Sequence, residues 1–270
     1  MYLVFNHEYC TISYSICQIT FIDFERKYII IVRQKKMIFE LDKLVYAYST
    51  VSDGNMSLNW GEKNEVEQNR VKFLRSCGMN VEDTVKASLV HGVEIKHVDR
   101  NDCGKELTCD SLITSDPAVI ICMVTADCFP LILYDRVNQV VSLSHLGHRG
   151  VTAKLAQKVV NKMHDMGANL AQTIAIIGPG ITKESYVFEQ VSQINDKNWQ
   201  PFLTKLPDGQ IAIDLPGYIT SQLTTGGIKK ENIIDLSINT AIDLRFFSHY
   251  RSIKNGESEA RFLSAVQIRE

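Results

Sequence analysis

Residues 119–150 read VIICMVTADCFPLILYDRVNQVVSLSHLGHRG and contain three short apolar runs separated by turns. The runs occupy residues 119–124, 131–134 and 140–146, and they are rich in Val, Ile and Leu, which is typical of buried strands. A turn that ends in proline separates the first two runs, and two glycines follow the third. This stretch therefore predicts three consecutive strands, with a helix that begins after Gly150.

Strands and helices also alternate on both sides of this stretch. Apolar residues at helical spacing predict helices over residues 64–77, 151–166 and 217–224. Further apolar runs predict strands over residues 85–90, 173–177, 233–236, 245–250 and 262–268, with another short segment at 210–215. No repeat or long linker interrupts the pattern. The sequence therefore predicts an α/β (mixed α+β) fold, a single domain whose helices pack on a central mixed β-sheet.

Residues 1–36 differ from the rest of the chain. They are rich in Ile, Tyr, Phe and Cys, carry no motif and end in the basic stretch RQKK at 33–36. A cleaner strand-like pattern begins at Met37. We keep two hypotheses open: residues 1–36 are an extension upstream of a natural start at Met37, or they add strands at the edge of the domain. The domain itself is expected over residues 37–270.

Composition limits the classes of function. The 270 residues are 45% hydrophobic and 22% charged, with a formal net charge of -2. No basic excess points to nucleic acid as a partner, so a small-molecule substrate is expected. The seven cysteines are odd in number, and no signal peptide or membrane-length apolar run is recognisable, so we expect a cytoplasmic protein without a membrane partner. The sequence leaves monomer and homodimer open.

Three reactive side chains lie where predicted strands end: His91, Cys128 and His145. Two imidazoles and one thiolate form a donor set that suits zinc, and three protein ligands leave a fourth position open. However, 37 positions separate His91 from Cys128 and 17 separate Cys128 from His145, which matches no local zinc-finger spacing. On spacing alone, ordinary structural roles for a buried cysteine and core histidines remain open.

The surrounding motifs resemble those of one protein family. They read VHG at 90–92, TADCFP at 125–130, HLGHRG at 145–150 and IGP at 177–179, in consistent order along the chain. The chain is similar to the laccase-domain family, once called multicopper polyphenol oxidases, whose bacterial members are also described as purine nucleoside phosphorylases and as a peptidoglycan editing factor. The resemblance implies a fold related to the cytotoxic necrotizing factor toxins.

The resemblance also implies a function and a ligand set. In that family the residues that match His91, Cys128 and His145 are zinc ligands. The implied reaction is phosphorolysis of adenosine, inosine and methylthioadenosine, with some adenosine deamination. The implied partners are a purine nucleoside and phosphate. Zinc is the expected cofactor, and copper is less favoured.

The chain departs from the family pattern beside the motifs. Leu89 replaces the usual Gln before the first motif, His148 replaces the usual Trp, and Val51 and Tyr250 replace basic residues. None of these positions is a metal ligand. The departures therefore bear on substrate specificity and turnover rather than on metal binding.

Further residues are expected to act at the site. We expect Cys128, His145 and Arg149 to be catalytic, and Arg149, Arg251 and His148 to bind substrate. The arginines suit phosphate, although Arg149 could form a structural ion pair instead and Arg251 could simply be solvated. His148 could act as an acid–base group, or it could simply fill the volume of the missing Trp.

Three alternative functions remain open at this point. The first is a copper-dependent phenol oxidase, although such an enzyme needs several coppers and more histidines than this cluster offers. The second is a hydrolase without metal, with Cys128 as nucleophile and His145 as base. The third is a non-catalytic family member. The zinc hypothesis makes a geometric prediction: the three ligand atoms should lie within about 4 Å of one another.

Overall fold

The structure is a computed structural model that describes residues 10–11, 18–23, 28–33 and 37–269. Its strands are β1 Cys10–Thr11, β2 Gln18–Asp23, β3 Tyr28–Arg33, β4 Met37–Leu41, β5 Leu44–Tyr48, β6 Thr84–Ser88, β7 Ile95–His97, β8 Glu106–Thr108, β9 Ser111–Thr114, β10 Ile120–Thr125, β11 Phe129–Asp135, β12 Val140–Leu146, β13 Thr173–Ile177, β14 Val187–Phe188, β15 Leu203–Lys205, β16 Ile211–Ile213, β17 Ile233–Asp235 and β18 Phe262–Ile268. Its α-helices are α1 Lys63–Ser76, α2 His148–Thr152, α3 Leu155–Asp165, α4 Leu215–Thr225 and α5 His249–Asn255.

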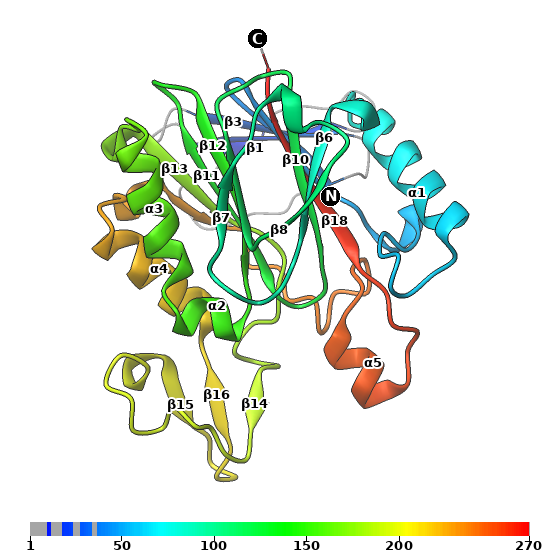
Figure 1. The fold of residues 1–270 in the computed structure, drawn as a ribbon. Coiled ribbons are helices and arrows are strands. Elements are labelled where there is room, and N and C mark those ends of the chain that lie inside the picture. Colours follow the sequence, from blue (N-terminus) through cyan, green and yellow to red (C-terminus); the bar gives the residue numbers. More distant parts are fainter. Residues whose placement is uncertain (1–9, 12–17, 24–27, 34–36, 270) are drawn as a thin grey trace.

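Two six-stranded mixed sheets form the body of the molecule (Figure 1). The first sheet has the order β4-β5-β18-β10-β6-β8, and the second has the order β17-β13-β11-β12-β9-β7. The α/β class of a single domain is confirmed, but two sheets pack together where the sequence predicted one central sheet. A smaller sheet, with the order β14-β16-β15, lies at one end of the molecule.

The alternation of side chains along β11 explains how the layers stack. Ile132 and Tyr134 point into the core between the two six-stranded sheets, whereas Leu131 and Leu133 point into a second core shared with α3 and α4. A third core lies between the first sheet and α1. Because both faces of β11 are covered, its sequence is continuously apolar rather than alternating. The resulting order of layers is α1, first sheet, second sheet, then α3 with α4 (Figure 1).

The predicted helix over residues 151–166 is in fact two helices, α2 and α3. Lys154 adopts a left-handed backbone conformation between them, with φ of 58°. In a continuous helix the carbonyl of Val151 would accept from Leu155, but here it accepts from the N–H of Lys154 and from Nε2 of Gln222 in α4. The side chain of Gln222 therefore helps to fix the end of α2.

A second correction concerns residues 245–250, which do not form the predicted strand. Phe246 is buried in the core, but the segment forms a loop followed by α5. Ser248 caps this helix by accepting from the N–H of Arg251 at 3.2 Å. The apolar pattern of this segment therefore reflects the burial of Phe246 from a loop. It does not reflect pairing in a sheet.

The described N-terminal residues form β1, β2 and β3, an antiparallel three-stranded sheet. Whether the natural protein starts at Met37 stays a prediction, because most of the residues before β4 lie outside the described ones. Within the described ranges, none of the helices combines the length and the apolar character needed to cross a membrane.

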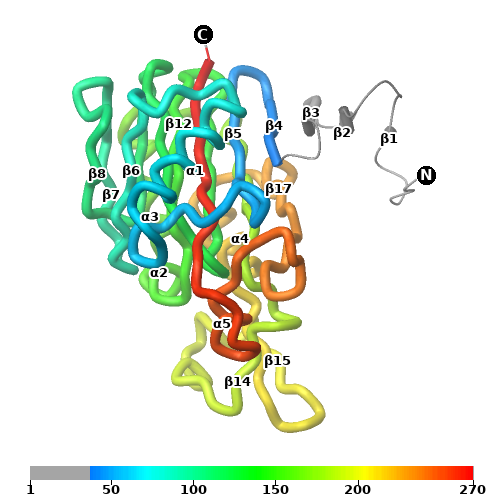
Figure 2. Tube along the Cα trace, turned by 90° about the vertical axis from the view of Figure 1, so that its right-hand side faces the viewer, coloured from blue at the N-terminus to red at the C-terminus, as the bar shows by residue number. Residues whose placement is uncertain are grey.

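One end of the sandwich gathers the loops that matter for function. The loop after β6, the turn before β11 and the end of β12 meet there, next to α2 (Figure 1). Two views at right angles both place α5 and the small β14-β16-β15 sheet toward this end (Figures 1 and 2).

Candidate metal centre

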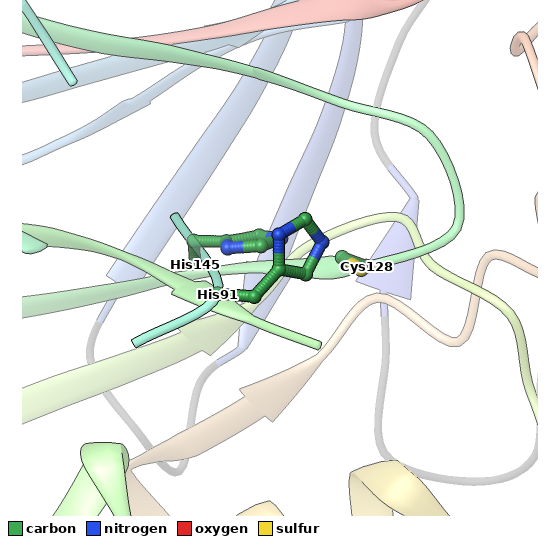
Figure 3. Close-up of side chains that lie close together, drawn as sticks. All are labelled: His91, Cys128 and His145. Atoms are coloured by element: carbon green, nitrogen blue, oxygen red, sulfur yellow. The ribbon is translucent and has the colours of Figure 1, made fainter. Parts of the chain in front are cut away.

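The structure brings His91, Cys128 and His145 together, as Figure 3 shows. One ligand atom from each residue lies within 4.8 Å of the others, and the two imidazole centroids are 4.7 Å apart. This separation slightly exceeds the expected limit of about 4 Å for a closed tetrahedral set. Two nitrogens and one sulfur are ligand atoms typical of zinc, but at this spacing they would have to move closer together to share one ion.

Each of the three residues comes from a different segment of the fold. His145 is paired with Pro130 near the end of β12, and Cys128 directly precedes β11 in the same sheet. His91 follows β6 of the first sheet and has a left-handed φ of 58°. His91 is exposed, Cys128 is half-buried and His145 is buried, so the centre opens to solvent on the His91 side.

A buried carboxylate supports two of the three residues. Oδ1 of Asp110 lies 2.9 Å from Nδ1 of His145 and also accepts from the backbone N–H of His91 at 2.9 Å. Its Oδ2 accepts from the N–H of Gly92 at 2.7 Å. Asp110 thus directs Nε2 of His145 toward the centre, because Nδ1 is used as a donor. The sequence offered only a weak signal for this residue, an aspartate immediately before a buried strand.

A second aspartate holds the Cys128 turn. Asp127 has a φ of 74°, and its carboxylate accepts from Oγ1 of Thr240 and from the N–H of Tyr250, both at 2.6 Å. Its carbonyl accepts from the N–H of Ile181 at 2.7 Å. These bonds fasten the turn to two later segments of the chain.

No side chain fits at position 147 beside the thiol of Cys128, so this position needs a glycine. A Cβ atom at this position would lie 2.7 Å from Sγ of Cys128 and 3.6 Å from Nε2 of His145. Gly147 itself has an ordinary φ of -87°. The glycine in the HLGHRG motif is therefore explained by the volume of the ligands rather than by backbone conformation.

The charges at the centre favour a thiolate. Burial on its own would raise the pKa of Cys128, but the charge of His145 and hydrogen bonds from His145 and His91 outweigh it and lower the pKa to about 6. Burial likewise opposes protonation of His145, yet the Cys128 thiolate and Asp110 raise its pKa to about 9. The thiolate is the form of cysteine that binds metals and attacks electrophiles.

The two candidate phosphate-binding arginines differ in their environment. Arg149 is exposed in the first turn of α2, and within the described part of the chain its side chain makes no hydrogen bond or ion pair. Arg251 is buried, pairs with Glu257 at 2.9 Å and donates to the carbonyls of Thr240 and Phe246. In this structure Arg251 braces the loop that covers the Cys128 turn, and its role in substrate binding stays a prediction.

His148 is packed against Trp199 and hydrogen-bonded to Gln193. Its ring stacks on Trp199 at 5.0 Å, and Nε2 accepts from the amide of Gln193 at 2.6 Å. Burial lowers its pKa, which keeps the ring neutral. Tyr186 lies 6.1 Å from the His148 ring and packs edge-on against the partly exposed Phe188 at 4.8 Å. No motif in the sequence indicated this group of aromatic rings.

Fold and centre together define a class: an α/β protein of two packed mixed sheets with one His-Cys-His centre at the ends of its strands. Comparison with known families identifies it further. Residues 45–269 match the family described as "Multi-copper polyphenol oxidoreductase laccase". The chain belongs to this family, as its motifs predicted.

Relatives of the chain carry enzyme names. It is 32% identical to a purine nucleoside phosphorylase of Deinococcus radiodurans over 121 residues, which cover 45% of this chain and 47% of that protein. It is 27% identical to a purine nucleoside phosphorylase of Clostridium acetobutylicum over 84% of this chain and 93% of that protein. Adenosine deaminase RL5, from an unknown prokaryotic organism, is 26% identical over 62% of this chain and 68% of that protein.

Solved structures share the fold. YlmD from Geobacillus stearothermophilus superposes with a TM-score of 0.79 at 22% identity, over 88% of this chain and 98% of that one. The hypothetical protein YfiH of Bacillus licheniformis gives a TM-score of 0.77 at 20% identity, over 87% and 98% of the two chains. The expected laccase-domain fold is therefore confirmed.

Proposed function

We propose that the protein is a zinc-dependent purine nucleoside phosphorylase that acts on adenosine, inosine and methylthioadenosine and also deaminates adenosine. The observation that carries this proposal is the convergence of His91, Cys128 and His145, with the exposed Arg149 following His145 by four positions in α2. The names of the relatives support an enzyme of purine metabolism, and the site supports the choice of metal chemistry.

Zinc fits this centre better than the coppers of a phenol oxidase. Two imidazoles and a thiolate are good zinc ligands, and the low pKa of Cys128 keeps the thiolate available at neutral pH. In the described ranges, these three residues are the one group of His, Cys, Asp and Glu that could hold a metal. A laccase reaction needs several coppers close together, for which this group has too few ligands. When bound, zinc would supply Lewis-acid polarisation of a substrate oxygen or nitrogen.

The protein's own groups suit phosphorolysis. Arg149 offers a free guanidinium that can hold phosphate, and Tyr186 and Phe188 offer ring faces that can pack against a purine. In this reaction a phosphate oxygen forms a bond to C1′ of the ribose while the bond from C1′ to the base nitrogen breaks. The electron pair leaves with the base, which takes up a proton, so the products are the free base and ribose 1-phosphate.

The cellular setting is part of the same proposal. We infer a cytoplasmic enzyme because Cys77, Cys103, Cys109, Cys122 and Cys128 are all free thiols in the structure. The substrates are small molecules, since the formal net charge of -2 provides no general attraction for nucleic acid.

One specific observation favours a second candidate, a hydrolase with Cys128 as nucleophile. The order Cys128, His145, Asp110 matches a nucleophile, a base and a carboxylate that orients the base, and the thiol has a pKa of about 6. His91 is neither the nucleophile nor the base in that mechanism. The two candidates therefore differ in whether His91 and a metal are needed for turnover.

Product analysis tests the proposed reaction. Purified protein of known metal content is incubated with adenosine, with and without phosphate, and the products are separated by chromatography. Phosphorolysis yields adenine only when phosphate is present, whereas deamination yields inosine without phosphate and inosine together with hypoxanthine when phosphate is present. Absence of both products from zinc-loaded protein would count against the proposal.

A further inference from the structure

We propose that Asp110 is a positioning residue that fixes two of the three metal ligands with one carboxylate, so that its loss weakens zinc binding beyond its effect on folding. The inference rests on the proposed metal centre. It concerns a residue that carries no ligand atom itself.

The geometry shows how one side chain reaches both ligands. Asp110 is fully buried immediately before β9, and its Oδ1 lies 2.9 Å from Nδ1 of His145 and 2.9 Å from the backbone nitrogen of His91. The second oxygen accepts from the N–H of Gly92 at 2.7 Å. The main chain of Asp110 adds two bonds, one from its N–H to Glu94 and one from the N–H of His145 to its carbonyl.

These contacts have different consequences for the two ligands. For His145, the hydrogen bond at Nδ1 fixes the tautomer and the ring plane, which leaves Nε2 free to bind an ion. For His91, the carboxylate restrains a loop residue that is exposed and has a left-handed φ of 58°, a conformation that costs energy for a residue with a side chain. Without Asp110 the two imidazoles would be free to separate. Part of the free energy of metal binding would then be used to order them.

Cys128 is held independently of Asp110. Its turn is fastened by Asp127, which bonds to Thr240 and Tyr250. One aspartate, Asp110, thus holds the two histidines, and another, Asp127, holds the cysteine. Removal of the Asp110 carboxylate should therefore loosen the imidazoles and leave the thiol in place.

Asp135 provides a matched control. It is also fully buried, and its carboxylate also accepts three hydrogen bonds, from the N–H of Val137, the amide of Asn138 and the N–H of Asn169. It lies at the other end of β11 from Cys128. Asp135→Asn therefore reproduces the loss of a buried carboxylate away from the metal centre.

The experiment measures zinc affinity by competition with a chromophoric chelator, in the unmodified protein, Asp110→Asn and Asp135→Asn. Asp110→Asn should weaken zinc binding about 10- to 100-fold, which is the usual effect of losing such a support, while Asp135→Asn should bind zinc like the unmodified protein. The ligand-field absorption of the Co(II)-loaded proteins should change for Asp110→Asn alone. If Asp110→Asn cannot be purified folded, Asp110→Glu, which keeps the charge but moves the oxygens, replaces it with the same expectation.

Two outcomes overturn the inference. Equal zinc affinity in Asp110→Asn and the unmodified protein would show that the carboxylate does not position the ligands. An equal loss in Asp135→Asn would show that the effect is one of general stability. If the unmodified protein binds no zinc, the metal centre itself is wrong, which is a distinguishable result.

Discussion

At the residue scale, Cys128 differs from the other cysteines that the structure describes. Its pKa is lowered to about 6, whereas burial raises the pKa of Cys109 to about 11 and that of Cys122 to about 12. The difference comes from the two imidazoles, since burial opposes the thiolate in all three. A selectively ionised cysteine is what both the zinc and the hydrolase candidates require.

This difference predicts selective alkylation. In metal-free protein at pH 7, iodoacetamide should modify Cys128 faster than Cys109 or Cys122, and peptide mass mapping would show it. Because the thiolate is lost as the pH falls through the pKa, the rate should fall steeply below about pH 6, approaching tenfold per unit. Bound zinc should protect the thiol. Equal modification of all three cysteines would contradict the charge arrangement.

Gly147 gives a second prediction at this scale. The Cβ of Gly147→Ala would lie 2.7 Å from Sγ of Cys128, so the thiol must move away from the centre. Zinc affinity should fall at least tenfold, as expected for a displaced ligand group. The backbone at φ of -87° accepts alanine, so the thermal stability of the metal-free protein should change little. Undiminished zinc binding would mean that Sγ is not a ligand.

Arg149 and Arg251 should respond differently to mutation. Arg149→Ala should raise the KM for phosphate about tenfold or more while zinc affinity stays the same, since the side chain is exposed and unpaired in the described structure. Arg251→Ala should instead destabilise the fold by about 2–3 kcal/mol through loss of buried charged hydrogen bonds. Steady-state kinetics measure the first effect and denaturant unfolding measures the second. A normal KM for phosphate in Arg149→Ala would show that Arg149 does not bind phosphate.

The sequence indicated the three candidate metal ligands through their motifs, but not the residues that hold them in place. His91, Cys128 and His145 stand in short recognisable patterns at strand ends. Asp110 acts across 35 positions of sequence, and its role depends on strand pairing that no local pattern encodes. For the same reason the sequence could not show that Arg251 is enclosed by its own loop.

At the element scale, the strands with both faces buried were the most predictable. The predicted ranges for β13 and β18 match the structure, because continuous apolar runs of this length have few other solutions. The strand predicted over residues 245–250 is absent, because Phe246 reaches the core from a loop. The division between α2 and α3 was hidden because Gln222, far along the chain, supplies the competing hydrogen bond.

The left-handed Lys154 between α2 and α3 predicts a stabilising mutation. Lys154→Gly should increase the free energy of unfolding by about 0.5–1 kcal/mol, because glycine adopts a φ of 58° without steric cost. The neighbouring Ala153, with φ of -81°, is the control: Ala153→Gly should destabilise by about the same amount. Chemical denaturation measures both variants, and a destabilising Lys154→Gly would contradict the conformation assigned to Lys154.

At the scale of the whole molecule, the metal centre joins the two large sheets. His91 follows β6 of the first sheet, whereas Cys128 directly precedes β11 and His145 lies in β12 of the second. An ion held by all three would therefore link the sheets at one end of the sandwich. The hydrophobic core between the sheets holds them together elsewhere.

This arrangement predicts that zinc stabilises the entire domain. Zinc at 100 times its Kd should add about 2.7 kcal/mol to the free energy of unfolding, since it binds only the folded state. The melting temperature should rise by roughly 5–10 °C for a chain of this size. His91→Ala should fold but lose the rise. A rise of equal size in His91→Ala would show that zinc binds elsewhere.

The most direct test of the proposed function is the metal dependence of adenosine turnover. Protein of measured zinc content is stripped with a strong chelator, assayed with adenosine and phosphate, and assayed again after zinc is restored. We expect turnover to disappear with the metal and to return with zinc, and His91→Ala to be inactive in every sample. Full activity in protein shown to contain no metal, or an active His91→Ala, would contradict the zinc mechanism and favour Cys128 as the nucleophile.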